Sequence, residues 1–307
     1  MKILARIPIY LGVVASLLVF PAGVPWMALG WILLFGVELL RGRPSWIFAA
    51  LPLVLILVKR VDWPLALPVL LLLLAASASG ARRLAVDRRR AAAALAVLLL
   101  GWTWVLWAWS DAARTSRRPS FDPDRPIVCV GDSLTAYAYP RELQNLVAAK
   151  VVDHGVGGTT AAQGLEALSR TLALKPQAVL IEFGGHDYLR DRTRDQTRAS
   201  LDAMIRACRE AGAEVILFEI PRGFLYDPFG GLERQLARAH DLELVTDGAI
   251  RSLILRSPWF PVRLGEPLSY DGLHPNEAGN AHLARAAAAA LARVYGPAAI
   301  RPGRGWY

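Results

Sequence analysis

The chain has 307 residues, of which 54% are hydrophobic and 20% charged, with a mean hydropathy of +0.33 and a formal net charge of +9. This composition argues against a single soluble globule, and the apolar residues are concentrated before residue 110. The charge argues against a nucleic-acid partner, because residues 1–126 carry the whole excess, whereas residues 127–307 contain 20 basic and 20 acidic residues. We therefore expect an apolar, basic first half followed by an electrically neutral folded domain.

The first half is a series of apolar runs separated by short charged or proline-containing breaks. A helix that crosses a bilayer needs about 20 apolar residues. We predict a transmembrane region over residues 1–109 with five spans, at residues 7–20, 24–40, 46–58, 64–79 and 91–109. The first, third and fourth runs are short, so one of them is alternatively a buried or re-entrant segment. A cleavable signal peptide is a second alternative for the start, but no Ala-x-Ala site follows and more apolar sequence does.

The basic residues of this half lie in alternate loops. They stand at the N-terminus, after the second span and after the fourth: Lys2, Arg6, Arg41, Arg43, Arg82, Arg83, Arg88, Arg89 and Arg90. The positive-inside rule then predicts an integral protein of the inner (cytoplasmic) membrane, with a cytoplasmic N-terminus and a C-terminal domain in the periplasm or outside the cell. Four arginines after the fifth span oppose this orientation, although three aspartates dilute them. Glu38 is the only acidic residue inside a span, so we interpret this half chiefly as an anchor.

A polar, proline-containing linker is expected at residues 110–126, and the rest of the chain alternates short apolar runs with helical patterns. This alternation predicts βαβ units and a parallel sheet in one α/β domain over residues 127–307. We expect strands at residues 127–130, 151–153, 178–182, 214–219 and 242–246. We expect helices at residues 140–149, 161–174, 195–211, 232–240, 248–255 and 277–295.

The first of these strands runs into Gly131-Asp132-Ser133-Leu134. Ser133 therefore reaches the carboxyl edge of the sheet, where open α/β sheets bind ligands. A serine hydroxyl is a weak nucleophile until a base takes its proton, so a histidine and a group that orients it are required. Asp132 is expected to be structural, with a carboxylate that ties down the turn.

The required base and its partner occur together near the end of the chain, in Asp271-Gly272-Leu273-His274. This spacing lets the Asp271 carboxylate accept the Nδ1 proton of His274 while Nε2 faces Ser133. The alternative is a turn that caps the last helix, for which Asn276 is the better candidate. After the second strand, Gly158 would let a main-chain N–H approach a developing oxyanion; the alternative is an ordinary turn glycine.

These blocks, together with Gly157-Gly158-Thr159-Thr160 and Gly184-Gly185-His186-Asp187, resemble the SGNH (GDSL) hydrolase superfamily. In order and spacing they are most similar to the small bacterial esterases, thioesterases and lysophospholipases, from residue 127 to the C-terminus. The resemblance implies a three-layer, flavodoxin-like parallel sheet and an acyl-enzyme reaction. It also implies an oxyanion hole made from the N–H groups of Ser133 and Gly158 and the side chain of the third block.

The third block departs from the family, which has asparagine where this chain has His186. A neutral imidazole also donates one N–H, and Asp187 or a main-chain carbonyl would fix its tautomer. The other histidines, His154, His240 and His282, have ordinary structural interpretations. No metal or other cofactor is expected, because no group of ligands has metal-site spacing that the triad does not already explain.

Two further features bear on the compartment and the substrate. Cys129 is expected to be buried, and a disulfide between Cys129 and Cys208 is possible but not favoured. Two apolar loops at the carboxyl edge supply tentative substrate-binding residues, Phe224, Tyr226 and Trp259, for an acyl or lipid tail or an apolar sugar face. The alternative is that these loops pack against the first half of the chain.

The sequence therefore predicts a membrane-anchored serine esterase that hydrolyses an ester in the cell envelope: an O-acetyl group, a lipid or a thioester. One rival is an O-acyltransferase in which a carbohydrate hydroxyl takes the acyl group. The other is a non-catalytic envelope module that keeps the fold as a binding surface. The oligomeric state is not predicted.

Overall fold

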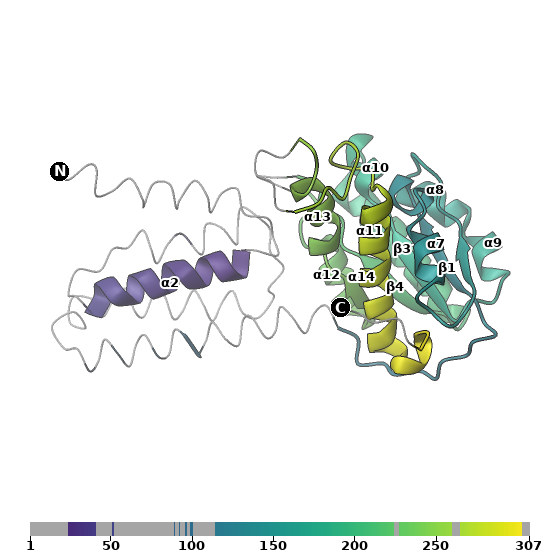
Figure 1. The fold of residues 1–307 in the computed structure, drawn as a ribbon, viewed down its shortest axis with the longest axis horizontal. Coiled ribbons are helices and arrows are strands. Elements are labelled where there is room, and N and C mark those ends of the chain that lie inside the picture. The colour runs from purple at the N-terminus through teal and green to yellow at the C-terminus, as the bar shows by residue number, and fades with distance from the viewer. Residues whose placement is uncertain are drawn as a thin grey trace. The chain divides into compact units, whose positions relative to one another are not determined.

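The computed structural model describes residues 24–40, 114–223, 227–259 and 265–302, together with isolated helical positions between 51 and 100. The chain divides into two compact units (Figure 1). One consists of Met1–Asp111 and Gly223–Gly231, and the other of Ala112–Arg222 and Leu232–Tyr307.

The first unit contains one fully described helix, α2 (Val24–Leu40), which coincides with the second expected span. The other four expected spans lie outside the described residues, apart from isolated helical positions. Among the residues that the structure describes, no helix has both the length and the apolar character needed to cross a membrane.

The second unit is built on one parallel sheet with the strand order β2-β1-β3-β4-β5. The strands are β1 (Ile127–Gly131), β2 (Val151–Asp153), β3 (Ala178–Glu182), β4 (Glu214–Phe218) and β5 (Glu243–Val245). β1, β3 and β4 are buried along their whole length, as their continuous apolar runs predict. The chain order reverses between β1 and β3, so their carboxyl ends form the switch point where such sheets bind ligands.

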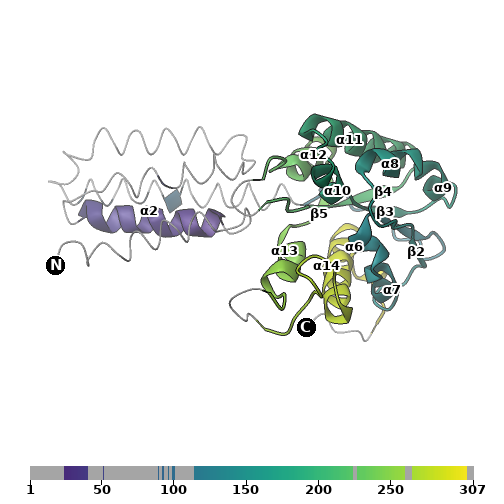
Figure 2. The ribbon, with the colours of Figure 1, turned by 90° about the horizontal axis from the view of Figure 1, so that it is seen from above.

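Helices cover both faces of this sheet (Figure 2). On one side lie α6 (Ser133–Ala136), α7 (Tyr139–Gln144), α13 (Gly248–Leu255) and α14 (Glu277–Tyr295). On the other lie α8 (Ala161–Glu166), α9 (Leu168–Leu172), α10 (Gly185–Leu189), α11 (Arg194–Glu210) and α12 (Leu232–His240). A short 3-10 helix, η3 (Pro297–Ala299), follows α14. The expected three-layer α/β architecture is confirmed.

The core follows from the alternation of side chains along the strands. Ile127 and Cys129 of β1 and Leu180 of β3 belong to one fully buried cluster with Ala287 and Leu291 of α14. The small alanines of α14 let this long helix lie close to the sheet. On the opposite side, α11 buries residues at helical spacing: Leu201, Met204, Ile205 and Cys208.

Two details differ from the expected helices. The helix expected at residues 161–174 is divided into α8 and α9 at Ala167. The helix expected at residues 140–149 ends early, at Gln144, whose side chain instead bonds the Ala149 carbonyl and the Val151 N–H. Gly164 of α8 allows close approach to the sheet, since an added Cβ would lie 2.4 Å from the Phe183 ring.

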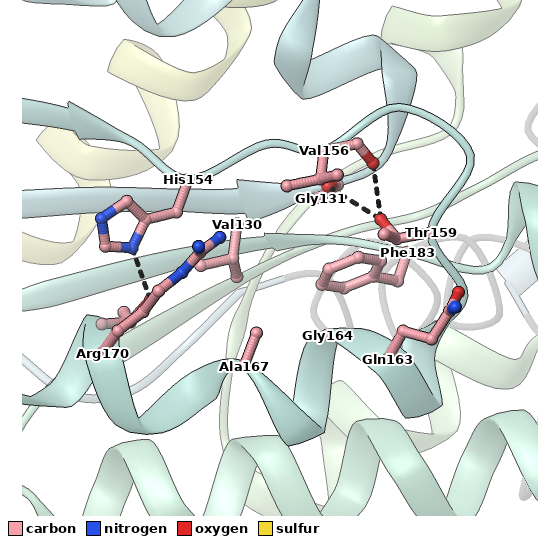
Figure 3. A pocket seen from close by; sticks show the side chains of 11 residues that line it. Val130, Gly131, His154, Val156, Thr159, Gln163, Gly164, Ala167, Arg170 and Phe183 are labelled. Carbon is pink, nitrogen blue, oxygen red and sulfur yellow. Dashed lines mark hydrogen bonds between the residues drawn. The ribbon is translucent and has the colours of Figure 1, made fainter.

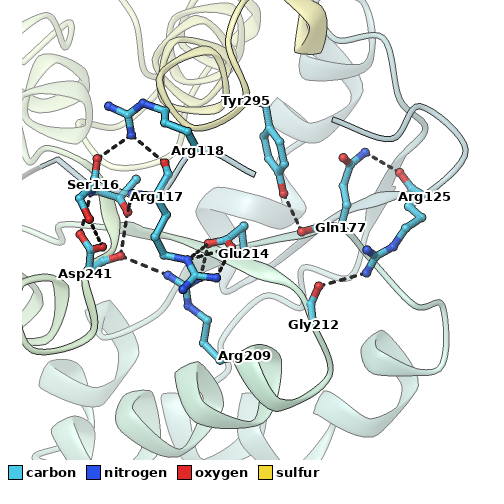
Figure 4. A network of polar contacts seen from close by, with 11 residues as sticks. Ser116, Arg117, Arg118, Arg125, Gln177, Arg209, Gly212, Glu214, Asp241 and Tyr295 are labelled. Atoms are coloured by element: carbon cyan, nitrogen blue, oxygen red, sulfur yellow. Dashed lines mark hydrogen bonds and ion pairs between the residues drawn. The ribbon is translucent and has the colours of Figure 1, made fainter. Parts of the chain in front are cut away.

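The segment expected to be a linker is bound along its described length, from residue 114, to the domain (Figure 4). Arg117 donates to Glu214 Oε1 from Nη2 and Nε, at 2.9 and 3.0 Å, and Ser116 donates to Asp241 at 2.6 Å. Arg125 donates to the carbonyls of Pro176 and Gly212, at 2.7 and 3.1 Å. These partners precede or begin strands, so the segment runs along the amino edge of the sheet, opposite Ser133.

Gly279, in the first turn of α14, provides a test of this packing. An added Cβ would lie 1.9 Å from the Leu268 carbonyl oxygen, in the segment that leads to His274. We expect Gly279→Ala to lower the free energy of unfolding by about 1–3 kcal/mol in urea denaturation, as overpacking does. Gly248→Ala is the control, because nothing lies within 4 Å of its added Cβ. It should stabilise by about 0.5–1 kcal/mol through helix propensity; equal shifts in both variants would contradict the packing described here.

Candidate active site

Ser133 is the first residue of α6, immediately after β1, and is 8% exposed. Asp132 caps this helix: its side chain accepts a hydrogen bond from the Leu134 N–H at 3.1 Å. This cap is the structural role that we expected for Asp132. Only glycine fits at Gly131, where an added Cβ would lie 2.1 Å from Thr135 Oγ1 and 2.6 Å from the Glu182 carbonyl oxygen. The tight strand–turn–helix therefore fixes where the serine hydroxyl stands.

Asp271 and His274 form the expected pair on the loop before α14. His274 Nδ1 lies 2.6 Å from Asp271 Oδ2, and the main-chain N–H groups of His274 and Leu273 donate to Asp271 Oδ1 at 2.7 and 2.9 Å. The bond from the His274 ring, and then those two N–H groups, lower the pKa of Asp271 to about 2. Asp271 is therefore ionised at neutral pH and holds the His274 ring by Nδ1, which leaves Nε2 for another partner.

A stacking contact brings this pair to the serine helix. The His274 ring lies on the Tyr137 ring with centroids 4.6 Å apart and an interplanar angle of 24°. The Tyr137 N–H in turn donates to the Ser133 carbonyl at 2.9 Å, one turn along α6. Ser133 Oγ and His274 Nε2 are not hydrogen-bonded to each other, and such contacts often tighten only when substrate is bound. Tyr137 was not expected from the sequence, which carries no signal for a stacking partner.

The loop after β2 lies against the same turn. The Val156 N–H donates to the Gly131 carbonyl at 3.0 Å, and an added Cβ on Gly157 would lie 4.0 Å from Ser133 Cβ. Gly158 has a φ of +81°, a conformation that favours glycine. Its N–H makes no hydrogen bond within the part of the chain that the structure describes. Gly158 therefore has the free donor and the backbone freedom that the oxyanion interpretation requires.

His186 lies in the first turn of α10, half-buried, at the carboxyl end of β3. Burial raises the pKa of the Asp132 carboxyl, and the ring and main-chain N–H of His186 act in the opposite direction. Asp187 does not orient the imidazole as proposed above. Its carboxylate accepts from the Ala161 N–H at 2.8 Å and from Thr197 Oγ1 at 3.0 Å, so it joins α10 to α8 and α11 instead.

Two residues that the sequence interpretation missed support these turns. Arg222 donates to the Gly184 carbonyl at 2.9 Å and pairs with Glu233. Gly184 has a φ of +126°, and an added Cβ would lie 2.0 Å from Arg222 Nη2. Glu182, the last residue of β3, accepts hydrogen bonds from both Asp132 and Thr135. A charged residue that ends a buried apolar strand was the available signal for Glu182.

A small cavity lies beside the Gly158 loop (Figure 3). It has a volume of about 30 Å³, and Val130, Thr159, Gly164 and Phe183 contribute to its lining. This is room for about one water, not for an acyl chain. His154 also borders it and bonds Thr171 Oγ1 at 2.8 Å, which agrees with a structural role for this histidine.

Several expected residues lie away from these contacts or outside the described residues. Phe224 and Tyr226 are outside them, so their tentative substrate-binding role stays a prediction. Trp259 is described and is 77% exposed. Cys129 and Cys208 are both buried and free, and burial raises the pKa of each thiol to about 12. His240 pairs with Asp202 at 2.6 Å, on the helices α12 and α11.

Comparison with known proteins gives relatives for the second unit. The chain is 29% identical over 165 residues to "Thioesterase 1/protease 1/lysophospholipase L1" of Escherichia coli K12, which covers 49% of this chain and 75% of that protein. It is 34% identical over 115 residues to "Esterase TesA" of Pseudomonas aeruginosa, covering 33% and 57%. A crystal structure of the psychrotrophic esterase EstA from Pseudoalteromonas sp. is similar at 21% identity and a TM-score of 0.46, covering 55% of this chain and 97% of that one.

The family match covers the segment that contains Ser133, Gly158, His186, Asp271 and His274. Residues 129–282 match the GDSL-like Lipase/Acylhydrolase family. The chain is therefore a member of the GDSL-like Lipase/Acylhydrolase family, and it is a GDSL/SGNH-type serine hydrolase of the esterase, thioesterase and lysophospholipase kind.

Proposed function

We propose that this protein is a membrane-anchored serine esterase that cleaves an acyl ester in the cell envelope, with Ser133, His274 and Asp271 as its catalytic residues. The observation that carries the proposal is the Asp271–His274 hydrogen bond of 2.6 Å, on a ring stacked against the helix that begins at Ser133. A base held by an ionised carboxylate next to a serine at a helix start is the arrangement that acyl transfer needs.

The reaction follows from these positions. Ser133 Oγ attacks the acyl carbon while its proton passes to His274 Nε2, and Asp271 stabilises the imidazolium that forms. The N–H groups of Ser133 and Gly158, with the ring N–H of His186, hold the negative charge on the former carbonyl oxygen. The leaving alcohol or thiol takes the proton from His274. Water, deprotonated by His274, then attacks the acyl-serine; the acid is released, and His274 returns the proton to Ser133 Oγ.

The side chains around the site favour an ester with an apolar part over an acetylated sugar. Eight large hydrophobic residues are more than 40% exposed in the described part of the second unit. All but Leu174 lie on, or next to, the loops and helices that contain the candidate catalytic and oxyanion residues. The other seven are Tyr137, Val156, Tyr188, Leu189, Trp259, Tyr270 and Leu273. Apolar surface gathered around a hydrolytic site suits an acyl or lipid tail.

The membrane anchor and its orientation rest on the sequence. The five apolar runs of residues 1–109 and the arginines in alternate loops support an inner-membrane protein whose catalytic domain is periplasmic or extracellular. The segment from residue 114 is hydrogen-bonded along the amino edge of the sheet. It is therefore part of the folded catalytic domain and not a loose tether.

The catalytic assignment predicts non-additive mutations. Ser133→Ala and His274→Ala should each lower turnover of p-nitrophenyl esters by on the order of 10⁴-fold or more, because the residues act as a unit. The double variant should be little slower than either single variant. Ser133→Ala should also abolish labelling by a fluorophosphonate probe, which measures the nucleophile directly. Independent losses that multiply in the double variant would contradict the assignment.

The oxyanion role of His186 predicts a difference between two substitutions. His186→Ala should lower kcat about 100-fold with little change in KM, because the lost donor serves the transition state. His186→Asn should retain most of the turnover, since its amide also donates an N–H. His240→Ala, on the distant pair with Asp202, is the control. If His186→Ala turns over like the wild type, the main-chain N–H groups of Ser133 and Gly158 form the hole without it.

The orientation predicts the outcome of C-terminal fusions at Tyr307. An alkaline phosphatase fusion should be active and a green fluorescent protein fusion dark, because the first folds only outside the cytoplasm and the second only within it. The reverse pattern would exclude an envelope substrate and leave the hydrolytic assignment in place.

A further inference from the structure

Glu182 stands behind the nucleophile turn, at the end of the central strand β3. It is 1% exposed. Its Oε2 accepts the Asp132 N–H at 3.2 Å and the Thr135 hydroxyl at 3.0 Å, so it bonds the residues on both sides of Ser133. An added Cβ on Gly131 would lie 2.6 Å from the same oxygen. The turn is therefore closed around this carboxyl group.

Glu182 differs from the other buried glutamates of the described residues in its partners. Four of the five form an ion pair with arginine: Glu214, Glu219, Glu233 and Glu243. Glu182 has none in the part of the chain that the structure describes. The titratable groups that face it are the Asp132 carboxyl at the start of α6 and the Tyr139 phenol on α7, with His186 of α10 beyond Asp132 and Cys129 of β1 beyond Tyr139.

These surroundings favour a proton on Glu182. Burial raises the pKa of the Glu182 carboxyl well above its usual range, and the neighbouring Asp132 carboxylate raises it further. Glu182 Oε1 is buried without a hydrogen-bond donor. In a carboxylate this oxygen would be an unpaired buried charge, which is strongly unfavourable. A proton on Glu182 removes this charge, and the neighbouring Asp132 carboxylate is the acceptor for that proton: burial raises the pKa of Asp132, and the side-chain bond with Glu182 acts in the opposite direction.

We propose that Glu182 is a positioning residue that acts as a neutral carboxyl group, with Oε2 holding the Ser133 turn and the proton bonded to the Asp132 carboxylate. Asp132 in turn accepts the Leu134 N–H and lies against Gly185, where an added Cβ would be 3.2 Å from Asp132 Oδ2. The carboxyl pair therefore sets the position of Ser133 relative to the His186 block. The inference rests on the proposed role of Ser133 as nucleophile.

The proposal fixes the sign of a pH effect. An unfolded glutamate ionises near pH 4.3, whereas the folded pKa of Glu182 is raised. The stability that Glu182 contributes is then complete below about pH 4.3 and is lost progressively as the pH rises toward the folded pKa. Glutamine at this position keeps both the acceptor and a donor but has no proton to lose.

The experiment compares Glu182→Gln and Glu182→Leu in the full-length protein, using the rate of fluorophosphonate labelling, kcat and KM on a p-nitrophenyl ester, and denaturation midpoints between pH 5 and 8. Glu182→Gln should label and turn over within about twofold of the wild type. Its stability relative to the wild type should increase with pH. Glu182→Leu should lose roughly 10- to 100-fold in labelling rate and kcat with KM little changed, because the nucleophile is displaced rather than removed.

Glu214→Gln is the matched control, a buried glutamate that begins its strand at the opposite edge and is paired with Arg117. It should lower stability and leave the labelling rate unchanged. Loss of activity in Glu182→Gln, or a stability difference from the wild type that does not change with pH, would overturn the neutral carboxyl. Labelling of Glu182→Leu at the wild-type rate would overturn the positioning role. Failure of the proposed function is separate, since it would appear as labelling that survives Ser133→Ala.

Discussion

The constraint on which this structure depends is the satisfaction of polar groups where β1 and β3 end side by side. Gly131 and Glu182 are paired in the sheet register, so both strands reach the carboxyl edge together. The turn that follows β1 leaves main-chain N–H groups in a buried place. Asp132 accepts the N–H of Leu134, and the Asp132 N–H is shared between the main-chain carbonyl and the carboxyl group of Glu182. Unsatisfied N–H groups here would each cost about 1–3 kcal/mol. The Ser133 N–H makes no hydrogen bond within the part of the chain that the structure describes, so it stays available to a substrate oxygen.

The sequence was sufficient for elements whose boundaries are set locally. β2, β3, α12, α13 and α14 have the expected bounds, because apolar runs and helical periodicity end there at polar residues, Gly or Pro. α6 and α10 were not expected. They have four and five residues, too few for a periodic pattern, and are held by contacts from other strands. The triad residues could be chosen from spacing and family resemblance. Tyr137 and Arg222 could not, because their roles depend on partners distant in the sequence, and for Glu182 the one signal was its place at the end of a buried apolar strand.

The same reason explains the segment expected to be a linker. Its prolines and charges are typical of a solvated connection, yet its partners lie far along the chain: the Thr115 N–H donates to Glu243, 128 residues away, at 3.1 Å. Glu243 also pairs with Arg293 of α14, and Glu214 with Arg209 of α11. Glu214 and Glu243 begin β4 and β5. Each of these two glutamates is neutralised both by an arginine of the segment and by an arginine of a helix. The composition of such a segment shows its charges, but it does not show that their partners are buried carboxylates elsewhere in the chain.

Glu214 and Glu182, at opposite edges of one sheet, therefore have opposite chemistry. At the amino edge, Glu214 is surrounded by guanidinium groups, and a charged carboxylate is the form that those partners stabilise. At the carboxyl edge, Glu182 meets hydroxyl, N–H and carboxyl groups, and an arginine there would bring a permanent positive charge beside Ser133. Such a charge would stabilise Asp132 as an anion without needing a proton on Glu182, but its bulk has no place in a turn where Gly131 lacks room for a methyl group. A second carboxyl is small enough to fit and, when neutral, supplies one donor and one acceptor. The same tight turn that fixes Ser133 thus leaves no room for a positive partner beside Glu182, which is why we propose that Glu182 is neutral.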